Sequence, residues 1–216
     1  FFRQNITPIL QRNDREKVFV LISDALRYEV ASELAEVIEK ELRGDLDLKP
    51  QFGVLPSITR LGMAALLPGK TLELIPGVNN VLRDGLNTQG AEARAQVLHK
   101  NSGVEATALS ATDLLAMTSE KGREAIKPYR LIYIYHDAID TIGDKPASER
   151  MVLDACDTAI QELLKLVKRL CNSLNATHVL ITADHGFLYQ RRAIAEADKL
   201  PLPKADDVLE SKRRMV

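Results

Sequence analysis

Residues 17–24 of the chain read KVFVLISD, in which five consecutive apolar side chains are followed by a serine and an aspartate. A short run that is apolar on both faces and bounded by charge is typical of a buried strand in a parallel sheet. The next segment, residues 28–43, carries apolar side chains three and four positions apart. This spacing predicts an amphipathic helix that ends at Gly44.

The alternation of strand and helix continues along the chain. Further strands are predicted at 51–56, 104–109, 131–135 and 178–183, and further helices at 59–67, 90–100 and 146–172. This order predicts an α/β fold with three layers, an open, mostly parallel sheet with helices on both faces. Residues 70–128 hold five glycines and only short apolar pieces. We expect this stretch to be a cap or a variable insertion in a single domain that spans 1–216.

The composition narrows the class of protein. The 216 residues carry 29 basic and 30 acidic side chains, so the whole surface offers no positive field that would attract nucleic acid. No apolar run approaches the roughly 18 residues of a membrane span. The two cysteines, Cys156 and Cys171, are expected to be free thiols of a cytoplasmic protein. Because the chain starts at Phe1 and ends on a charged stretch, we expect a fragment of a longer protein, truncated at its C-terminal end.

Three predicted strands end in acidic or histidine residues: Asp24, then Asp137 with Asp140, then Asp184 with His185. Ligands bind beyond the carboxyl ends of the strands in an open parallel sheet, so we expect these side chains to converge. Clustered carboxylates repel one another unless a cation neutralises them, and carboxylate with imidazole suits Zn or Mn better than Ca. Each residue alone has another interpretation: Asp24 as a helix cap, Asp140 as a surface acid, and His185 as a turn residue.

Thr59 is the candidate nucleophile. The chain turns at Pro56 and then begins a predicted helix, whose N-terminus favours an anion through its free N–H groups and its dipole. A hydroxyl at that position suits an alkoxide that accepts a phosphoryl group. Thr59 could equally be an N-cap, and Ser57 competes with it for either role. Arg60, the next residue, is a candidate phosphate contact.

Four segments together resemble a known superfamily. They are SDALRYE at 23–29, LPSIT at 55–59, YHDAIDTIGD at 135–144 and TADHGFLY at 182–189. In this order they look like the alkaline phosphatase superfamily, and most of all its nucleotide pyrophosphatase/phosphodiesterase branch. More specifically, the chain resembles the PglZ domain of bacterial phage-exclusion (BREX) systems. The resemblance implies an alkaline phosphatase-like core.

The resemblance also implies roles for particular residues. It implies two divalent metals, Zn or else Mn or Mg, held by carboxylates and one imidazole: Asp24, Asp184 and His185 for the first metal, and Asp140 and Asp144 for the second. Thr59 would lie between the metals as the nucleophile. Apart from these implied roles, Arg60 and Arg27 are candidate contacts for the substrate. The implied activity is metal-dependent phosphoryl transfer or hydrolysis, with a phosphodiester favoured over a monoester and nucleic acid as a substrate in the context of phage defence.

Two departures from the family pattern leave a second hypothesis open. Asp144 stands where the family usually has His, and no His follows His185 to complete the second metal site. His136 is a candidate replacement. An incomplete site would suit an interaction module of weak or absent activity within the same defence complex. For both hypotheses, the expected partners are other subunits of the defence system, and no association with a membrane is expected.

Overall fold

The main sheet contains four strands. The computed structural model describes residues 1–12, 14–75, 78, 80–143 and 151–187. The strands of the main sheet are β1 (Val18–Ser23), β5 (Ala106–Ser110), β6 (Leu131–His136) and β7 (His178–Thr182). Their order is β5-β6-β1-β7, and every neighbouring pair is parallel. The α/β fold with a parallel sheet is therefore confirmed, and the carboxyl ends of β6, β1 and β7 lie at the same edge.

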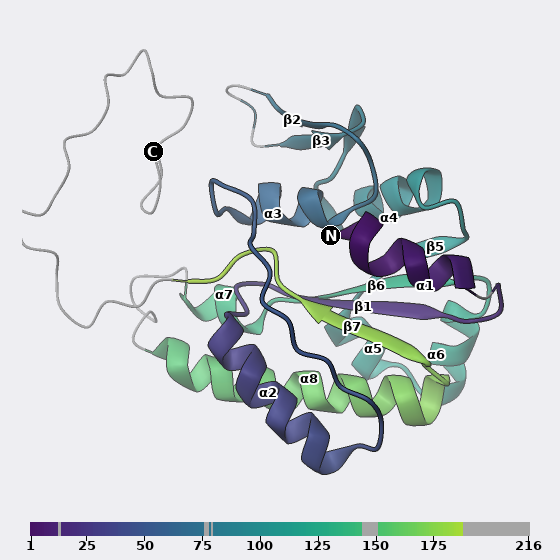
Figure 1. The fold of residues 1–216 in the computed structure, drawn as a ribbon, viewed down its shortest axis with the longest axis vertical. Helices are drawn as coiled ribbons and strands as arrows, with labels where there is room; N and C mark the ends of the chain where they lie inside the picture. The colour runs from purple at the N-terminus through teal and green to yellow at the C-terminus, as the bar shows by residue number, and fades with distance from the viewer. Residues whose placement is uncertain (13, 76–77, 79, 144–150, 188–216) are drawn as a thin grey trace, which may run out of the picture.

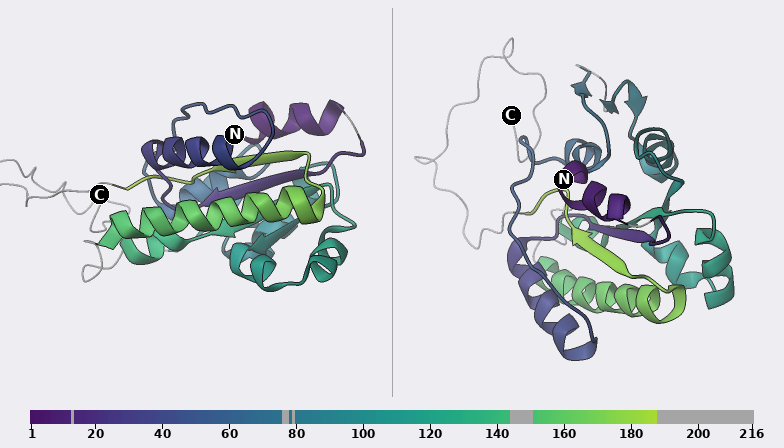
Figure 2. Two further views of the ribbon diagram at one scale, coloured as in Figure 1. Left: turned by 90° about the horizontal axis from the view of Figure 1, so that it is seen from below. Right: turned by 45° about the vertical axis from the view of Figure 1, so that its right-hand side comes forward.

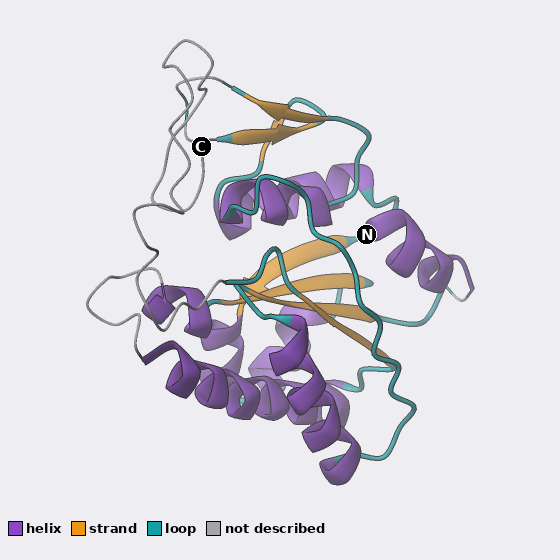
Figure 3. Cartoon of the chain, turned by 60° about the vertical axis from the view of Figure 1, so that its left-hand side comes forward, coloured by secondary structure: helices purple, strands orange, loops and turns teal. Residues whose placement is uncertain are grey.

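Strand β1 is buried on both faces because helices cover each side of the sheet (Figures 1 and 3). On one side, Phe19 and Leu21 pack against α2 (Tyr28–Glu41), α5 (Ala111–Ala116) and α8 (Val152–Leu174). The predicted helix 28–43 is thus confirmed over most of its length. It ends earlier than expected, because Leu42 is already extended, so Gly44 is not its cap.

The opposite face of the sheet is covered by the N-terminal segment together with α3 and α4 (Figure 1). The N-terminal segment contains a short π-helix, Phe2–Ile6, and α1 (Thr7–Arg12). Val18, Val20 and Ile22 point to this side, alternating with the two residues that face α8. Helices α3 (Thr59–Leu66) and α4 (Gly90–Asn101) agree with the predicted helices at 59–67 and 90–100.

A small antiparallel sheet stands apart from the main one (Figure 2, right). It consists of β2 (Leu72–Leu74), β3 (Val81–Arg83) and β4 (Leu86–Asn87), and it contacts α3 through a cluster of Leu61, Ala64 and Val81. Farther along the same 70–128 stretch, β5 forms the edge of the main sheet, as predicted for 104–109, and α6 (Ser119–Ile126) follows α5. Within the described part of this stretch, β2, β3 and β4 form the separate sheet, whereas β5 belongs to the main sheet.

The strand predicted at 51–56 is wrong. These residues form an irregular loop in which Phe52 and Leu55 are exposed. Gly53 and Pro56 both weaken a strand, and Val54, which is partly buried, is the one apolar side chain of the segment that packs against a core cluster. The loop nevertheless leads into α3, so Thr59 still begins a helix.

The long helix predicted at 146–172 is observed from Val152 to Leu174, with its apolar stripe against the sheet, and residues 146–150 lie outside the described part. A short helix, α7 (Ala138–Gly143), precedes it. Within the described residues, no helix has both the length and the apolarity needed to cross a membrane.

Candidate functional site

Strand ends bring the candidate residues together. Asp24 directly follows β1, whereas Asp184 and His185 follow the neighbouring strand β7. On the other side of β1, strand β6 leads into α7, which carries Asp140. The backbone turns sharply after Asp24, with Ala25 in the left-handed region at φ 63°, and the Ala25 N–H donates to Asp184 Oδ1 at 3.3 Å. This hydrogen bond joins the two acidic loops.

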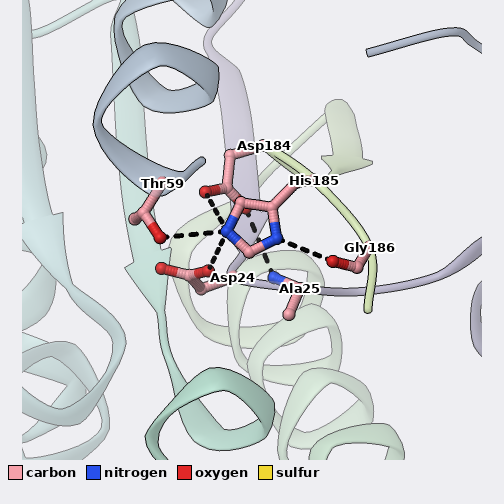
Figure 4. A network of polar contacts seen from close by, with 6 residues as sticks. All are labelled: Asp24, Ala25, Thr59, Asp184, His185 and Gly186. Atoms are coloured by element: carbon pink, nitrogen blue, oxygen red, sulfur yellow. Dashed lines mark hydrogen bonds and ion pairs between the residues drawn. The ribbon is translucent and has the colours of Figure 1, made fainter. Parts of the chain in front are cut away.

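One nitrogen of His185 lies at the centre of the polar network in Figure 4. Its Nε2 is 2.9 Å from Thr59 Oγ1, and it is 3.4 Å from both Asp24 Oδ1 and Asp184 Oδ2. The other ring nitrogen, Nδ1, is 2.8 Å from the carbonyl oxygen of Gly186. Because a carbonyl can only accept, Nδ1 is assigned the hydrogen. In the neutral ring, Nε2 then presents its lone pair to Thr59 and the carboxylates.

Asp24, Asp140 and His185 form a group whose potential ligand atoms all lie within 4.8 Å of one another. Three observations fit a cation here. Asp24 Oδ1 and Asp184 Oδ2 are buried and make no hydrogen bond within the described part of the chain. Two carboxylates with one imidazole nitrogen form a donor set that suits Zn or Mn. A metal-ligating histidine commonly donates its second N–H to a carbonyl, as His185 does to Gly186.

The electrostatics of the site also favour a cation. Burial, followed by the negative charges of Asp184 and Asp140, raises the pKa of Asp24 to about 9. Burial likewise raises the pKa of Asp184, although His185 and the Ala25 N–H act in the opposite direction. Without a cation, the cluster therefore retains protons at neutral pH. A divalent ion would take their place.

Thr59 reaches the site because α3 approaches the Asp184 loop very closely. A Cβ atom on Gly62 would lie 2.4 Å from the backbone oxygen of Asp184, so only glycine permits this approach. Thr59 is the first residue of α3, after Ile58 as N-cap, and its hydroxyl is the one that contacts His185. Ser57, the competing candidate, is exposed.

The two candidate arginines differ in their surroundings. Arg27 pairs with Glu29 at 2.5 Å, and its guanidinium lies 5.0 Å from the ring centroid of Phe187. A Cβ atom on Gly186, beside His185, would lie 3.2 Å from Arg27 Cγ, so the Arg27 side chain passes next to this position. Arg60 follows Thr59 in α3 and is partly buried.

The remaining predicted ligands have different outcomes. The structure brings Asp140, the predicted ligand of the second metal, within 4.8 Å of the ligand atoms of Asp24 and His185. Asp144 lies outside the described residues. His136 does not replace a ligand, because Ser23 and Glu162 occupy its two ring nitrogens.

Sequence reasoning missed Arg94 of α4. Its guanidinium lies 4.6 Å from the ring centroid of Tyr135, its Nε donates to the carbonyl of Thr88 at 2.8 Å, and its charge opposes the rise in the pKa of Asp24. No local motif marks this arginine. It approaches the site only because α4 packs on the sheet, so no sequence signal could have identified it.

Comparisons with known proteins identify a family and two relatives of this chain. The profile of the family described as "PglZ: BREX system PglZ alkaline phosphatase-like domain" matches residues 1–216. The chain is 41% identical over 218 residues to "Alkaline phosphatase-like protein BrxZ" of Escherichia coli O9:H4 (strain HS). It is 37% identical over 216 residues to "Alkaline phosphatase-like protein PglZ" of Bacillus cereus (strain H3081.97).

Both matches include the whole of this chain and 25% of the relative. The chain thus spans about a quarter of the length of the curated relatives it matches. The full-length match to the family profile and the two relatives nevertheless agree with each other. The chain belongs to the family of PglZ alkaline phosphatase-like domains of BREX systems.

Proposed function

We propose that this domain transfers or hydrolyses phosphoryl groups with the help of a divalent metal, as part of a BREX defence protein in the cytoplasm. The observation that carries the proposal is the position of Thr59 Oγ1, 2.9 Å from His185 Nε2 and beside the acidic group. A hydroxyl next to a cation-binding set and at a helix N-terminus is suited to attack phosphorus. Family membership supports the same class of chemistry.

Each residue has a role in this proposal. Asp24, Asp140 and His185 would hold the metal, with Asp184 close enough to contribute an oxygen or to orient the others. When bound, zinc or manganese would supply charge stabilisation to the phosphoryl oxygens and to the Thr59 alkoxide. In the structure the Thr59 hydroxyl donates to His185 Nε2. A metal on His185 would take the Nε2 lone pair in place of this hydrogen bond and would leave the Thr59 oxygen beside the cation. Arg60 and Arg27 are the proposed contacts for the phosphate.

Thr59 would attack phosphorus and expel the leaving alcohol or aryl oxide, which takes up a proton. Water would then cleave the bond between phosphorus and Thr59 Oγ1, releasing the phosphate product and restoring the hydroxyl. We favour a phosphodiester over a monoester, because the threonine nucleophile resembles that of the diesterase branch. Nucleic acid is the proposed physiological substrate, and other subunits of the defence system are the proposed partners.

The direct test compares two hydroxyl variants in the full-length protein. Hydrolysis of an aryl phosphodiester and an aryl phosphomonoester would be measured with added Zn or Mn. Thr59→Ala is expected to lower kcat/KM by about 10³-fold or more, because the nucleophile is lost, whereas Ser57→Ala leaves it within about twofold. Full activity of Thr59→Ala would disprove the assignment of the nucleophile.

A second candidate is an interaction module with little chemistry. It is favoured by one observation: the described residues provide a single group of three ligands, not two. Metal content of the full-length protein distinguishes the candidates. At least one tightly bound Zn or Mn that is lost in Asp24→Asn supports the enzyme, and its absence supports the module.

A further inference from the structure

A second series of hydrogen bonds lies next to the group formed by Asp24, Asp140 and His185, which we call the acidic group. Ser23 Oγ is 3.0 Å from His136 Nδ1, and His136 Nε2 is 2.9 Å from Glu162 Oε2 of α8. The three residues come from β1, β6 and α8, and Ser23 and His136 are paired in the parallel register. This Ser23–His136–Glu162 chain therefore links the end of the strand that carries Asp24 to a helix on one face of the sheet.

Serine, histidine and glutamate are the residue types of a nucleophilic triad. The burial of Ser23 excludes that role. Ser23 is 0% exposed and His136 is 4% exposed, so no substrate can reach the hydroxyl. Glu162 is the outer end of the chain, with 41% of its side chain exposed. A buried serine without access to substrate acts only through the groups that it holds in place.

The hydrogen-bond directions follow from the partners. The carboxylate of Glu162 accepts, so His136 Nε2 carries a hydrogen and donates it. In the neutral ring, Nδ1 is then the acceptor for the Ser23 hydroxyl. The carboxylate thus fixes both the tautomer and the orientation of the imidazole, as an outer carboxylate does for histidines beside metal sites.

His136 is connected to both carboxylates of the proposed metal group. Its carbonyl oxygen accepts the backbone N–H of Asp24 at 2.7 Å. Two residues after it, α7 begins and carries Asp140. Glu162 and Ser23 therefore hold His136 in place. His136 in turn fixes Asp24 through a hydrogen bond between strands, and Asp140 through the short stretch of chain between β6 and α7.

We propose that Ser23, His136 and Glu162 are positioning residues that hold Asp24 and Asp140 at metal-binding distance. This proposal rests on the proposed function for its metal. The hydrogen bonds of the Ser23–His136–Glu162 chain are present in the structure without a metal. It assigns no contact between these three residues and the substrate. Loss of Glu162 is expected to loosen the end of β1 and to weaken metal binding without removing any ligand.

The chain offers a matched control at the opposite end of the same sheet. His178 Nε2 is 2.8 Å from Glu16 Oε2, a pair of the same residue types and similar length, although its histidine side chain is 31% exposed. His178 begins β7, and Glu16 precedes β1, so this pair lies at the amino ends of the strands. Removing Glu16 deletes an equivalent hydrogen bond far from the acidic group.

The experiment compares Glu162→Ala, Glu162→Gln and Glu16→Ala in the full-length protein. The first readout is Mn²⁺ affinity, with the site defined as the binding that Asp24→Asn abolishes. Glu162→Ala is expected to weaken it by about tenfold or more, within the range for outer partners of metal ligands. Glu162→Gln keeps an acceptor oxygen and retains most of the affinity, and Glu16→Ala leaves it unchanged.

The second readout needs no metal. Hydrogen exchange of the peptide that covers the end of β1 is expected to accelerate in Glu162→Ala, because His136, whose carbonyl accepts the Asp24 N–H, is held less firmly. Exchange is expected to stay unchanged in Glu16→Ala. Ser23→Ala, a smaller change, serves if Glu162→Ala does not fold.

Unchanged Mn²⁺ affinity, or equal weakening in Glu16→Ala, overturns the positioning role. If the unmodified protein binds no metal, the proposed function fails, and the exchange result alone decides the inference. In that case, unchanged exchange at the end of β1 overturns it.

Discussion

The pKa of Asp24 is raised far above the ordinary value of an aspartate. Its pKa of about 9 results first from burial and then from two neighbouring carboxylates, and Arg94 offsets only part of it. An aspartate in the unfolded chain has a pKa of about 4. The folded, metal-free protein therefore binds a proton that the unfolded chain releases between these two values.

This difference predicts how metal-free stability depends on pH. Because the folded pKa of Asp24 is raised, its protonated form contributes stability in full below about pH 4, and that contribution declines as the pH rises toward about 9. The melting temperature measured in EDTA is expected to decrease as the pH is raised from 5 to 8. Asp24→Asn, which cannot ionise, is expected to flatten that decline.

Metal affinity is predicted to have the opposite pH dependence. Mn²⁺ must displace the proton on Asp24, so affinity falls by up to about tenfold for each pH unit below about 9. Calorimetric titration in buffers of different ionisation enthalpy would measure the proton released. No released proton at pH 7 would contradict the raised pKa.

Gly62 gives a steric prediction at the same scale. Its substitution by alanine would place a methyl group 2.4 Å from the Asp184 carbonyl oxygen, forcing α3 away from the loop. Gly62→Ala is expected to cost about 1–3 kcal/mol of stability and to lower activity as Thr59 moves from His185. Gly44→Ala, whose added Cβ meets nothing within 4 Å, is the control. Thermal unfolding and phosphodiester hydrolysis would measure both effects.

The convergence of those acidic-group residues that directly follow strands could be predicted from the sequence, because the end of a strand fixes where the next side chain lies. Asp24 and His185 are of this kind, and the structure brings them together. Arg94 could not be predicted, since it reaches Tyr135 through the packing of α4 on the sheet. Gly62 was equally hidden, because its importance depends on a contact with residue 184 that no local pattern encodes.

At the scale of elements, continuous apolar runs were the most reliable signals. β1 and β6 each coincide with such a run, because both faces of a central strand are buried. The segment 51–56 carried the same apolar residue types but forms a loop, with Phe52 and Leu55 in solvent. Residue type alone does not reveal whether a partner strand exists, and here β5 and β7 occupy the sheet edges.

Lys17 carries a prediction about how elements are joined. Its Nζ donates to the carbonyl oxygens of Ile126 at 2.7 Å, Lys127 at 3.1 Å and Tyr129 at 2.5 Å. The ammonium thus satisfies carbonyls at the C-terminal end of α6 and ties them to the start of β1. Lys17→Met is expected to destabilise the chain by about 1–3 kcal/mol in urea unfolding.

The matched control is Lys165→Met on the exposed face of α8, which is expected to change stability by less than about 0.5 kcal/mol. Equal effects of the two substitutions would show that the three carbonyl contacts add nothing beyond a surface charge.

At the scale of the whole molecule, the class of fold was predictable, but the strand order was not. The order β5-β6-β1-β7 places the first strand of the chain between the last two. Such an order depends on pairing between segments more than 100 residues apart, as in Val18 with Leu131 and with His178. This order allows loops from three strands to meet at one edge, and the site is therefore a property of the assembled sheet.

A site assembled from distant segments predicts that metal stabilises the molecule as a whole. Asp24, Asp140 and His185 come together only in the folded chain, so a metal that binds them favours the folded state over the unfolded one. At a concentration about 100 times the Kd, the gain is about 2.7 kcal/mol. For a chain of this length, that corresponds to a rise in Tm of roughly 5–10 °C.

Mn²⁺ and Zn²⁺ are expected to give this rise, Ca²⁺ a smaller one, because imidazole is a poor ligand for a cation that prefers oxygen. Asp24→Asn and His185→Ala are expected to abolish it, although their substitutions are 161 residues apart in the chain. Thermal unfolding with each metal and with EDTA is the measurement. A rise that survives both substitutions would show that the metal binds elsewhere, and the absence of any rise would favour the interaction module over the enzyme.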